Sequence, residues 1–307
     1  MNKSIFSLAD VLTVLSAVAF GFVCFLGSNF YTLGDTKKSL ILAVIITILL
    51  GGLAFLAKFL KRVQGNFKTS FILEVVVLIL FTGLMIYFTY SPFSHYFAVS
   101  DKKEEIQDQL SNNITQAQNM FTDYEGYANT RMSVYYSTLN SVIELKNPDE
   151  YSIYGFEDKE VSDETQIKNK MLYIHSDLFP SNYSDTTSNN GIKQIATEWL
   201  ADGQKKVTDW TPIGLVGVVN DIEDKSLGWQ NDLVGYSSIK ETGEDRSLYS
   251  STLSFNDVKA NFTTLGKPTP LSIVLGIITW VLMLLSWFIT KRSSKVFRGL
   301  AKYEVEL

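Results

Sequence analysis

Apolar residues are gathered into four long runs rather than spread evenly along the chain. A helix of roughly 20 residues crosses a hydrocarbon core of about 30 Å, and each run reaches about that length. Backbone that faces lipid must satisfy its amide groups internally, which favours helices. The pattern therefore predicts four transmembrane helices. They cover residues 10–28, 39–57, 70–90 and 271–290.

The first run has an alternative interpretation as a secretory signal peptide. Its apolar stretch is longer than the roughly 7–15 residues typical of such peptides. Only Lys3 precedes it, and no Ala-x-Ala-like cleavage site follows it. We therefore expect a retained membrane span.

Between the third and fourth runs, apolar residues recur at steps of three and four. The stripe extends from Asp101 to Lys146 and is typical of a packed helix or coiled coil. Asn147-Pro148 is expected to end it. We predict that the stripe packs inside a bundle or contacts a partner protein. Its candidate residues are Ile106, Leu110, Ile114, Tyr124, Tyr127, Tyr135 and Leu139, with Trp229 further along the chain.

Shorter helices are expected over residues 162–179, 191–202 and 254–265, and another over 211–240. Four glycines weaken the last prediction, so part of 211–240 could be extended. The long helix and the 211–240 helix are expected to run antiparallel. The fold class is an all-α membrane protein with a mostly helical bundle inserted between the third and fourth spans. The domains are residues 1–91, 92–268 and 269–307.

Lysine and arginine in short loops near the spans predict the orientation. The connection between the first two spans carries only Lys37 and Lys38, beside Asp35. The loop after the second span and the tail are far more basic. We expect an integral protein of the bacterial inner membrane, with both termini in the cytoplasm and residues 92–268 in the periplasm. The topology-setting cations are Lys58, Lys61, Arg62, Lys68, Lys291, Arg292, Lys295 and Arg298.

The expected outer domain is acidic. Residues 91–268 carry 27 acidic and 15 basic side chains, within a chain of net charge −5. This charge argues against nucleic acid or anionic lipid as a partner of the outer domain. The only cysteine, Cys24, lies inside the first span and says nothing about the redox compartment.

Glu74 is the ionisable residue that lies well inside an apolar run. A charge at the bilayer centre costs at least about 2.5–3.5 kcal/mol, so such residues are candidates for ion or proton relays and for partner salt bridges. The alternative is that Glu74 has no function inside the membrane and is tolerated because of its position. Glu74 is about one turn from the cytoplasmic end of its run, near Lys68, and could reach the interface.

No motif points to catalysis or to a cofactor. His95 and His175 lack the spacing of metal ligands and the context of a catalytic triad. There is no phosphate-binding glycine pattern, and the acidic pairs lack the spacing of a calcium loop. We expect a protein that is not an enzyme, binds no cofactor and acts through other protein subunits, as an oligomer.

The arrangement of spans resembles the TssN family, the multi-span inner-membrane subunits of the type VI secretion system of Bacteroidetes. The resemblance rests on three amino-terminal spans, a large outer domain at about 92–268, the closing span and the basic tail KRSSKVFRGLAK. It implies a scaffold of a trans-envelope complex, with periplasmic subunits on the outer bundle and baseplate proteins near the basic loop.

Two other functions stay open at this point. One is a sensory adaptor that binds a ligand in its outer bundle and signals to a separate cytoplasmic protein. The other is an oligomeric ion or proton channel that uses Glu74.

Overall fold

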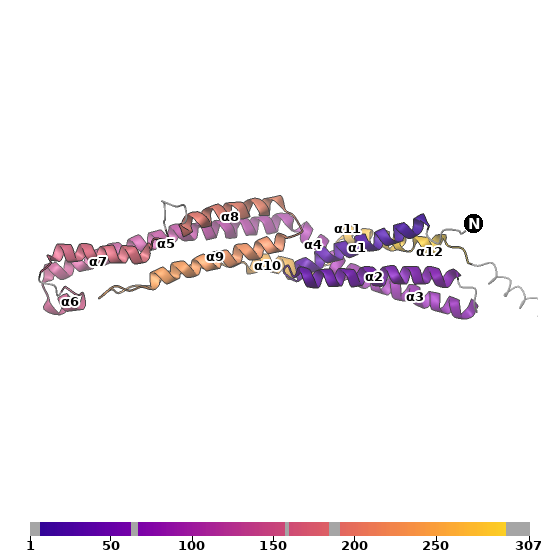
Figure 1. The fold of residues 1–307 in the computed structure, drawn as a ribbon, viewed down its shortest axis with the longest axis horizontal. Coiled ribbons are helices and arrows are strands. Elements are labelled where there is room, and N and C mark those ends of the chain that lie inside the picture. The colour runs from indigo at the N-terminus through magenta and orange to yellow at the C-terminus, as the bar shows by residue number, and fades with distance from the viewer. Residues whose placement is uncertain (1–6, 63–66, 157–159, 184–190, 293–307) are drawn as a thin grey trace, which may run out of the picture. The chain divides into compact units, whose positions relative to one another are not determined.

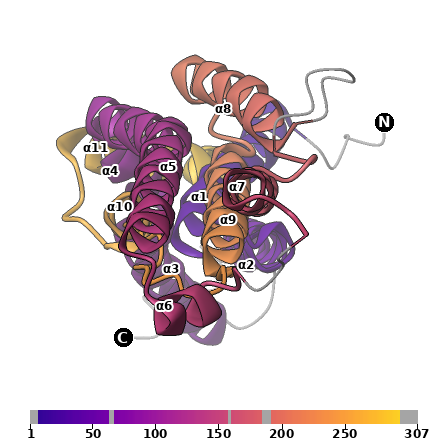
Figure 2. The same cartoon turned by 90° about the vertical axis from the view of Figure 1, so that its left-hand side faces the viewer.

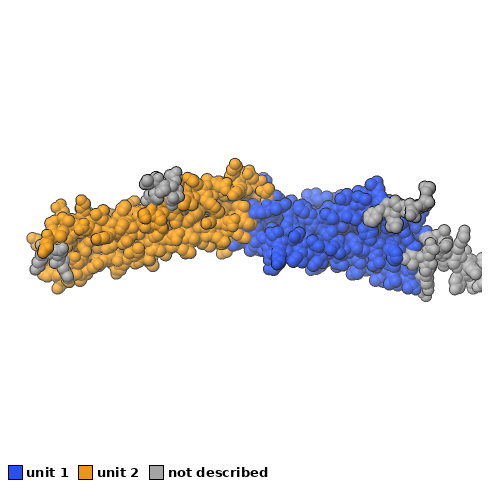
Figure 3. All heavy atoms as spheres, viewed as in Figure 1, with its two compact units in different colours: residues 1–106, 212–216, 258–307 blue, residues 107–211, 217–257 orange. Residues whose placement is uncertain are grey.

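The computed structural model describes residues 7–62, 67–156, 160–183 and 191–292, and every element within them is a helix (Figure 1). The chain divides into two units (Figure 3). Unit 1 comprises residues 1–106, 212–216 and 258–307, and unit 2 comprises residues 107–211 and 217–257. The helices are α1 (Leu8–Tyr31), α2 (Thr36–Arg62), α3 (Phe67–Phe88), η1 (Thr89–Phe93), α4 (Ser94–Asp101), α5 (Lys103–Leu145), α6 (Pro148–Ile153), α7 (Asp163–Leu178), α8 (Ile192–Asp209), α9 (Leu215–Ser238), α10 (Asn256–Thr263), α11 (Pro270–Met283) and α12 (Leu285–Ile289).

Unit 1 contains three helices that are long and apolar enough to cross a membrane. They are α1, α2 and the continuous run Thr69–Asp101 through α3, η1 and α4. The third run continues through Pro92 to Asp101, past the expected end of the span at residue 90. The chain passes this proline through the π-helical turn η1, because a proline has no N–H for the regular ladder.

The last apolar run is divided. α11 ends at Met283 and α12 begins at Leu285, so the sequence-based expectation of one unbroken helix over 271–290 is wrong in this detail. The Thr13 hydroxyl donates to the Met283 carbonyl at 3.0 Å, and a side chain that enters the ladder in this way is a known cause of helix breaks.

Small residues allow the helices of unit 1 to approach closely. A Cβ at Gly27 would lie 1.9 Å from the carbonyl oxygen of Pro92, and one at Gly21 would lie 1.9 Å from the Thr47 hydroxyl. The apolar core fills the remaining space between the helices. Its members include Phe20, Ile46, Leu50, Phe81, Met85, Phe93 and Met283.

In unit 2, α7 and α8 each return along the long helix α5. Lys193 forms an ion pair with Glu125 at 2.6 Å, whereas Gln107 donates to the carbonyl of Val207 at 2.9 Å. As the residue number rises in α8 it falls in α5, so the two helices are antiparallel. Figure 2 views these helices nearly end on.

Helix α9 runs parallel to α5, which contradicts the antiparallel arrangement expected from the sequence. Phe121 packs on Trp229 with ring centroids 6.2 Å apart, and Arg131 donates to the Ser237 carbonyl at 2.9 Å. Because α7 and α8 already lead back along α5, α9 again follows the direction of α5. We call residues 239–255, which follow α9, the strap. They turn at Thr242–Gly243 and then lead back along α5, from Glu244 beside Arg131 to Tyr249 beside Met120.

Candidate functional sites

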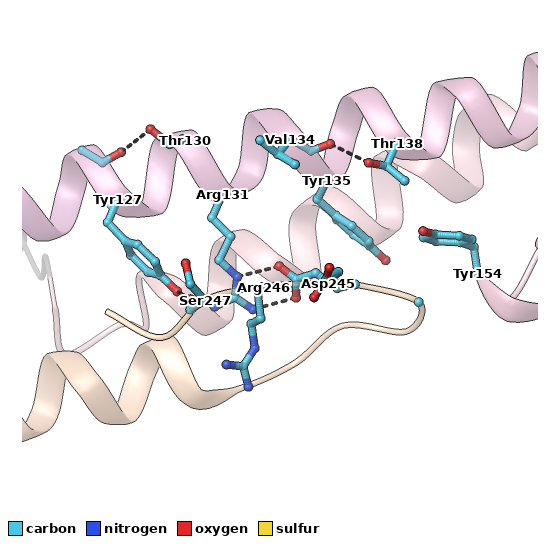
Figure 4. A pocket seen from close by; sticks show the side chains of 13 residues that line it. Tyr127, Thr130, Arg131, Val134, Tyr135, Thr138, Tyr154, Asp245, Arg246 and Ser247 are labelled. Carbon is cyan, nitrogen blue, oxygen red and sulfur yellow. Dashed lines mark hydrogen bonds and ion pairs between the residues drawn. The ribbon is translucent and has the colours of Figure 1, made fainter. Parts of the chain in front are cut away.

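A pocket of about 480 Å³ lies in unit 2 between α5, α6 and the strap (Figure 4). α5 contributes successive side chains of one face, and the strap residues Gly243 to Ser247 form the opposite wall. The lining combines three tyrosines, two arginines and two acids. These side chains are Tyr127, Tyr135, Tyr154, Arg131, Arg246, Glu244 and Asp245.

Arg131 and Glu244 form a buried ion pair at this pocket. The Arg131 Nε donates to Glu244 Oε1 at 2.6 Å, and Nη2 donates to Oε2 at 2.7 Å. The same guanidinium donates to the carbonyls of Ser237 and Ile239, at 2.9 and 2.5 Å. Burial alone would lower the pKa of Arg131, but the hydrogen bonds and charge of Glu244 outweigh this effect and raise the pKa. The pair therefore fixes the start of the strap against α5 and α9.

Tyrosine hydroxyls hold the strap at two further points. Tyr127 donates to the Ser247 carbonyl at 2.7 Å, and Tyr135 donates to the Thr242 carbonyl at 3.1 Å. Burial raises the pKa of Tyr135, so its hydroxyl remains a neutral donor at physiological pH. Gly243 has φ +78°, and a Cβ there would lie 2.6 Å from the Tyr154 ring. The strap therefore needs glycine where it passes Tyr154.

Most of the sequence-predicted stripe lies in the interior of the protein. Tyr127 differs, since it is half-buried and lines the pocket. Tyr124 is an example of a buried stripe residue. It donates to the Leu178 carbonyl at 2.7 Å and its ring lies 5.2 Å from that of Tyr249. The buried members are Ile106, Leu110, Ile114, Tyr124, Tyr135, Leu139 and Trp229.

The sequence analysis did not identify Arg131 and Glu244. A signal was present, because Arg131 falls between Ala128 and Tyr135 on the buried face of α5. A charged residue at such a position needs a buried partner of opposite charge. The sequence could not indicate that the partner lies more than a hundred residues away in a non-helical segment.

A second polar cluster lies in unit 1, at the ends of α1 and α2, the start of α3, and α12. Glu74 is 1% exposed, accepts a hydrogen bond from the Trp287 indole at 2.8 Å and forms an ion pair with Arg292 at 2.7 Å. Lys61 donates to the Trp287 carbonyl at 2.8 Å, and its Nζ lies 4.2 Å from the centroid of that indole. The sequence analysis named Glu74 as a charge inside an apolar run but did not indicate its partners, Trp287 and Arg292, which lie in or after the last apolar segment.

Asp10 lies in the same cluster and is also 1% exposed. It completes a capping box with Ser7 at the start of α1. Its carboxylate also accepts hydrogen bonds from Lys58 and Ser286. Lys58 is therefore not a free loop cation, since it lies inside α2, is 7% exposed and has its charge balanced by Asp10.

The remaining topology-setting cations are only partly covered by the structure. Lys61 and Arg62 form the last turn of α2, and Lys291 and Arg292 follow α12. Lys295 and Arg298 lie outside the described residues, as does the side chain of Lys68.

Within the described residues, no group of three or more His, Cys, Asp or Glu side chains is placed to hold a metal ion. No protein-family model, curated protein or solved structure matches the chain.

Proposed function

We propose that the chain is a non-enzymatic scaffold subunit of a multi-protein envelope complex, anchored in the membrane by four spans. The observation that carries this proposal is the composition of the unit 2 pocket. Tyrosine and arginine are the side chains enriched at the energetic centres of protein interfaces. In the pocket both arginines and two of the three tyrosines already hold the strap in place. The pocket is thus a rigid, preformed surface suited to protein contact.

The fourth span is the segment Pro270–Ile289. Its 20 residues would rise about 30 Å as helix, close to the thickness of a hydrocarbon core. Gly276 packs against Thr89, while Ser286 and Trp287 reach Asp10 and Glu74. The segment therefore lies beside the three longer helices of unit 1 over much of their length.

The basic end of this four-helix base faces the cytoplasm in our proposal. Lys58 is paired with Asp10 and Arg292 with Glu74, and the further cations Lys61, Arg62 and Lys291 lie close to the ends of α2 and α12. The positive-inside rule then orients the base. Residues 92–268 lie outside the cytoplasm, in the periplasm if the membrane is a bacterial inner membrane. The resemblance to TssN would make the complex a type VI secretion system.

The two other functions have less support. The Glu74 carboxylate already has an ion-pair partner and an indole donor, which favours a structural role over ion conduction. The donors of Arg131 are engaged inside the fold, so this guanidinium offers little to a small anionic ligand.

A photo-crosslinking amino acid at Val134 tests the scaffold proposal in native membranes. Val134 lines the pocket and is 57% exposed. The matched control position is Leu172 on α7, which is 59% exposed and does not line the pocket. We expect Val134 to crosslink to a few specific proteins, and Leu172 to crosslink to none of them. A chain that migrates alone on native gels and crosslinks at neither position would contradict the proposal.

A further inference from the structure

Three cavities of unit 2 lie in a row between one face of α5 and the strap. The first is the pocket described above, which spans residues 126–138 of α5 and 243–247 of the strap. The second, of about 440 Å³, spans residues 116–123 and 249–253. The third, of about 540 Å³, begins at Asn113 and Gln116 and includes strap residues 251–254.

The α5 residues of these cavities follow one another at steps of three and four. Such positions share one face of a helix. The cavities therefore follow one another along this face of α5, beside the strap, which runs antiparallel to α5. Residues 113–138 correspond to about 37 Å of helix at about 1.5 Å per residue. We call this feature the strap groove.

The strap has the alternation of a β-strand without a strand partner. Tyr249 and Phe255 are buried, whereas Ser250, Thr252 and Ser254 are exposed. Alternate side chains on opposite faces are the property of an extended strand. In the part of the chain that the structure describes, no backbone–backbone hydrogen bond joins residues 245–255 to another segment.

Backbone groups on the edge of the strap that faces α9 already form hydrogen bonds. The Tyr249 N–H donates to the Ser237 hydroxyl at 3.1 Å, and the Ser251 carbonyl accepts from the Gln230 amide at 2.5 Å. In an extended chain, the N–H and C=O of one residue point to the same edge, and those of the next residue point to the other edge. The backbone groups of Ser250 and Thr252 therefore face away from α9.

Ser250 and Thr252 are exposed and line the second cavity. Among the described residues neither backbone has a hydrogen-bond partner in the protein. This leaves two N–H and two C=O groups along one open edge. A partner segment in extended conformation could pair with them, as in β-strand addition. A helical partner could not, since its backbone groups bond internally.

The charge of the strap groove favours a basic partner. Asp123, Asp245 and Asp257 line it, and none of these carboxylates forms an ion pair within the described residues. Of the two bases in the lining, Arg131 is paired with Glu244 and Arg246 donates to the Ser238 carbonyl, so three acids stand against one remaining positive charge. Complementary charge at an interface mainly sets specificity and the rate of association.

We propose that the strap groove binds an extended segment of a partner protein that adds a strand to Ser250 and Thr252. This segment carries lysine or arginine side chains opposite Asp123 and Asp245. The inference rests on the proposed function, in which unit 2 contacts other proteins, and it specifies the conformation and charge of the segment that is bound.

The test is a selection of randomised, displayed dodecapeptides on the full-length protein in lipid nanodiscs. We expect enriched peptides that alternate apolar with polar residues and contain lysine or arginine. Selected peptides with apolar residues at steps of three and four would overturn the proposal, because they would bind as helices. Acidic peptides, or no enrichment at all, would also overturn it.

Affinity measurements on the best peptide separate backbone pairing from side-chain contact. Thr252→Pro removes the N–H at the open edge, and we expect roughly tenfold weaker binding. Thr252→Val retains that N–H and should bind within about threefold of the parent. Asp123→Asn should weaken binding more at low salt than at high salt.

Because a proline could perturb the strap itself, the same peptide with N-methyl groups on alternate residues provides a test on the unaltered protein. Unchanged affinity of the N-methylated peptide would overturn strand addition. A dimer of the protein that Thr252→Pro abolishes would assign the groove to a second copy of the chain instead. Failure of these tests together with specific crosslinks from Val134 would reject the strap groove alone and leave the scaffold proposal standing.

Discussion

The ion pair between Arg131 and Glu244 gives the sharpest test of how the strap is held. The perturbation is Arg131→Met, which keeps a long side chain but removes the charge. The two side chains are 6% and 3% exposed, so the variant leaves a carboxylate without its partner inside the protein. Loss of one partner of a buried pair costs about 3–5 kcal/mol. Even the lower figure changes the equilibrium for local opening by roughly 100-fold.

Hydrogen exchange of the full-length protein in nanodiscs measures this change. Local opening has its own free energy in different parts of a protein, so the strap can be followed separately. We expect amides of residues 241–249 to exchange roughly 100-fold faster in Arg131→Met, with α1 and α2 unchanged. Unchanged exchange in the strap would refute the assignment of Arg131 as its anchor.

The double variant Arg131→Met/Glu244→Leu identifies the cause. Replacing both partners by apolar side chains removes the unpaired carboxylate, and such replacements of buried pairs are often neutral. Here the carbonyls of Ser237 and Ile239 still lose their donor, at about 1 kcal/mol each. The double variant should therefore exchange more slowly than the single variant but faster than the parent. If it were no slower than the single variant, the buried-charge argument would be wrong.

Three further predictions concern other parts of the chain. Glu74→Gln removes the negative charge that pairs with the partly exposed Arg292. The variant should destabilise α12 by about 1–3 kcal/mol, and hydrogen exchange over residues 285–289 should become faster. Gly27→Ala forces a methyl group against the Pro92 carbonyl and should lower the melting temperature through about 1–3 kcal/mol of overpacking, whereas Gly52→Ala, with nothing within 4 Å, should not. Burial, followed by Asp177, raises the pKa of Glu241 above its ordinary 4.5, so the folded state binds its proton more tightly. The strap should therefore become more stable as pH falls from neutral towards 4.5, and Glu241→Gln should remove that dependence in hydrogen exchange.

The helices of the chain could be predicted from the sequence because their apolar stripes and caps are local signals. The stripe beginning near Asp101 predicted α5, and Asn147-Pro148 ended it at the observed place, with Asn147 capping α6. Ser162 caps α7 as its position suggested. The doubtful region 211–240 is helix from Leu215, despite its glycines, because its apolar face packs on α5 and α8. Packing outweighed propensity there.

The direction of α9 and the role of the strap could not be predicted in the same way. A stripe shows that a helix has a buried face, but a parallel and an antiparallel neighbour bury it equally well. The strap lacks helical periodicity, and its alternation is too short to stand out between polar residues. Its position depends on Arg131, Tyr127 and Tyr135, which contact it from more than a hundred residues earlier in the chain.

Buried ion pairs supply the information that the apolar stripes lack. Asp10 with Lys58, Glu74 with Arg292, and Arg131 with Glu244 each join segments that are distant in sequence. A buried pair contributes little net stability compared with an apolar replacement, but an arrangement that leaves one of its charges unpaired is strongly disfavoured. A shift of α9 or α12 by one turn would preserve much of the apolar contact and would break these pairs. The pairs therefore act against alternative registers, in two units whose apolar surfaces alone would permit several.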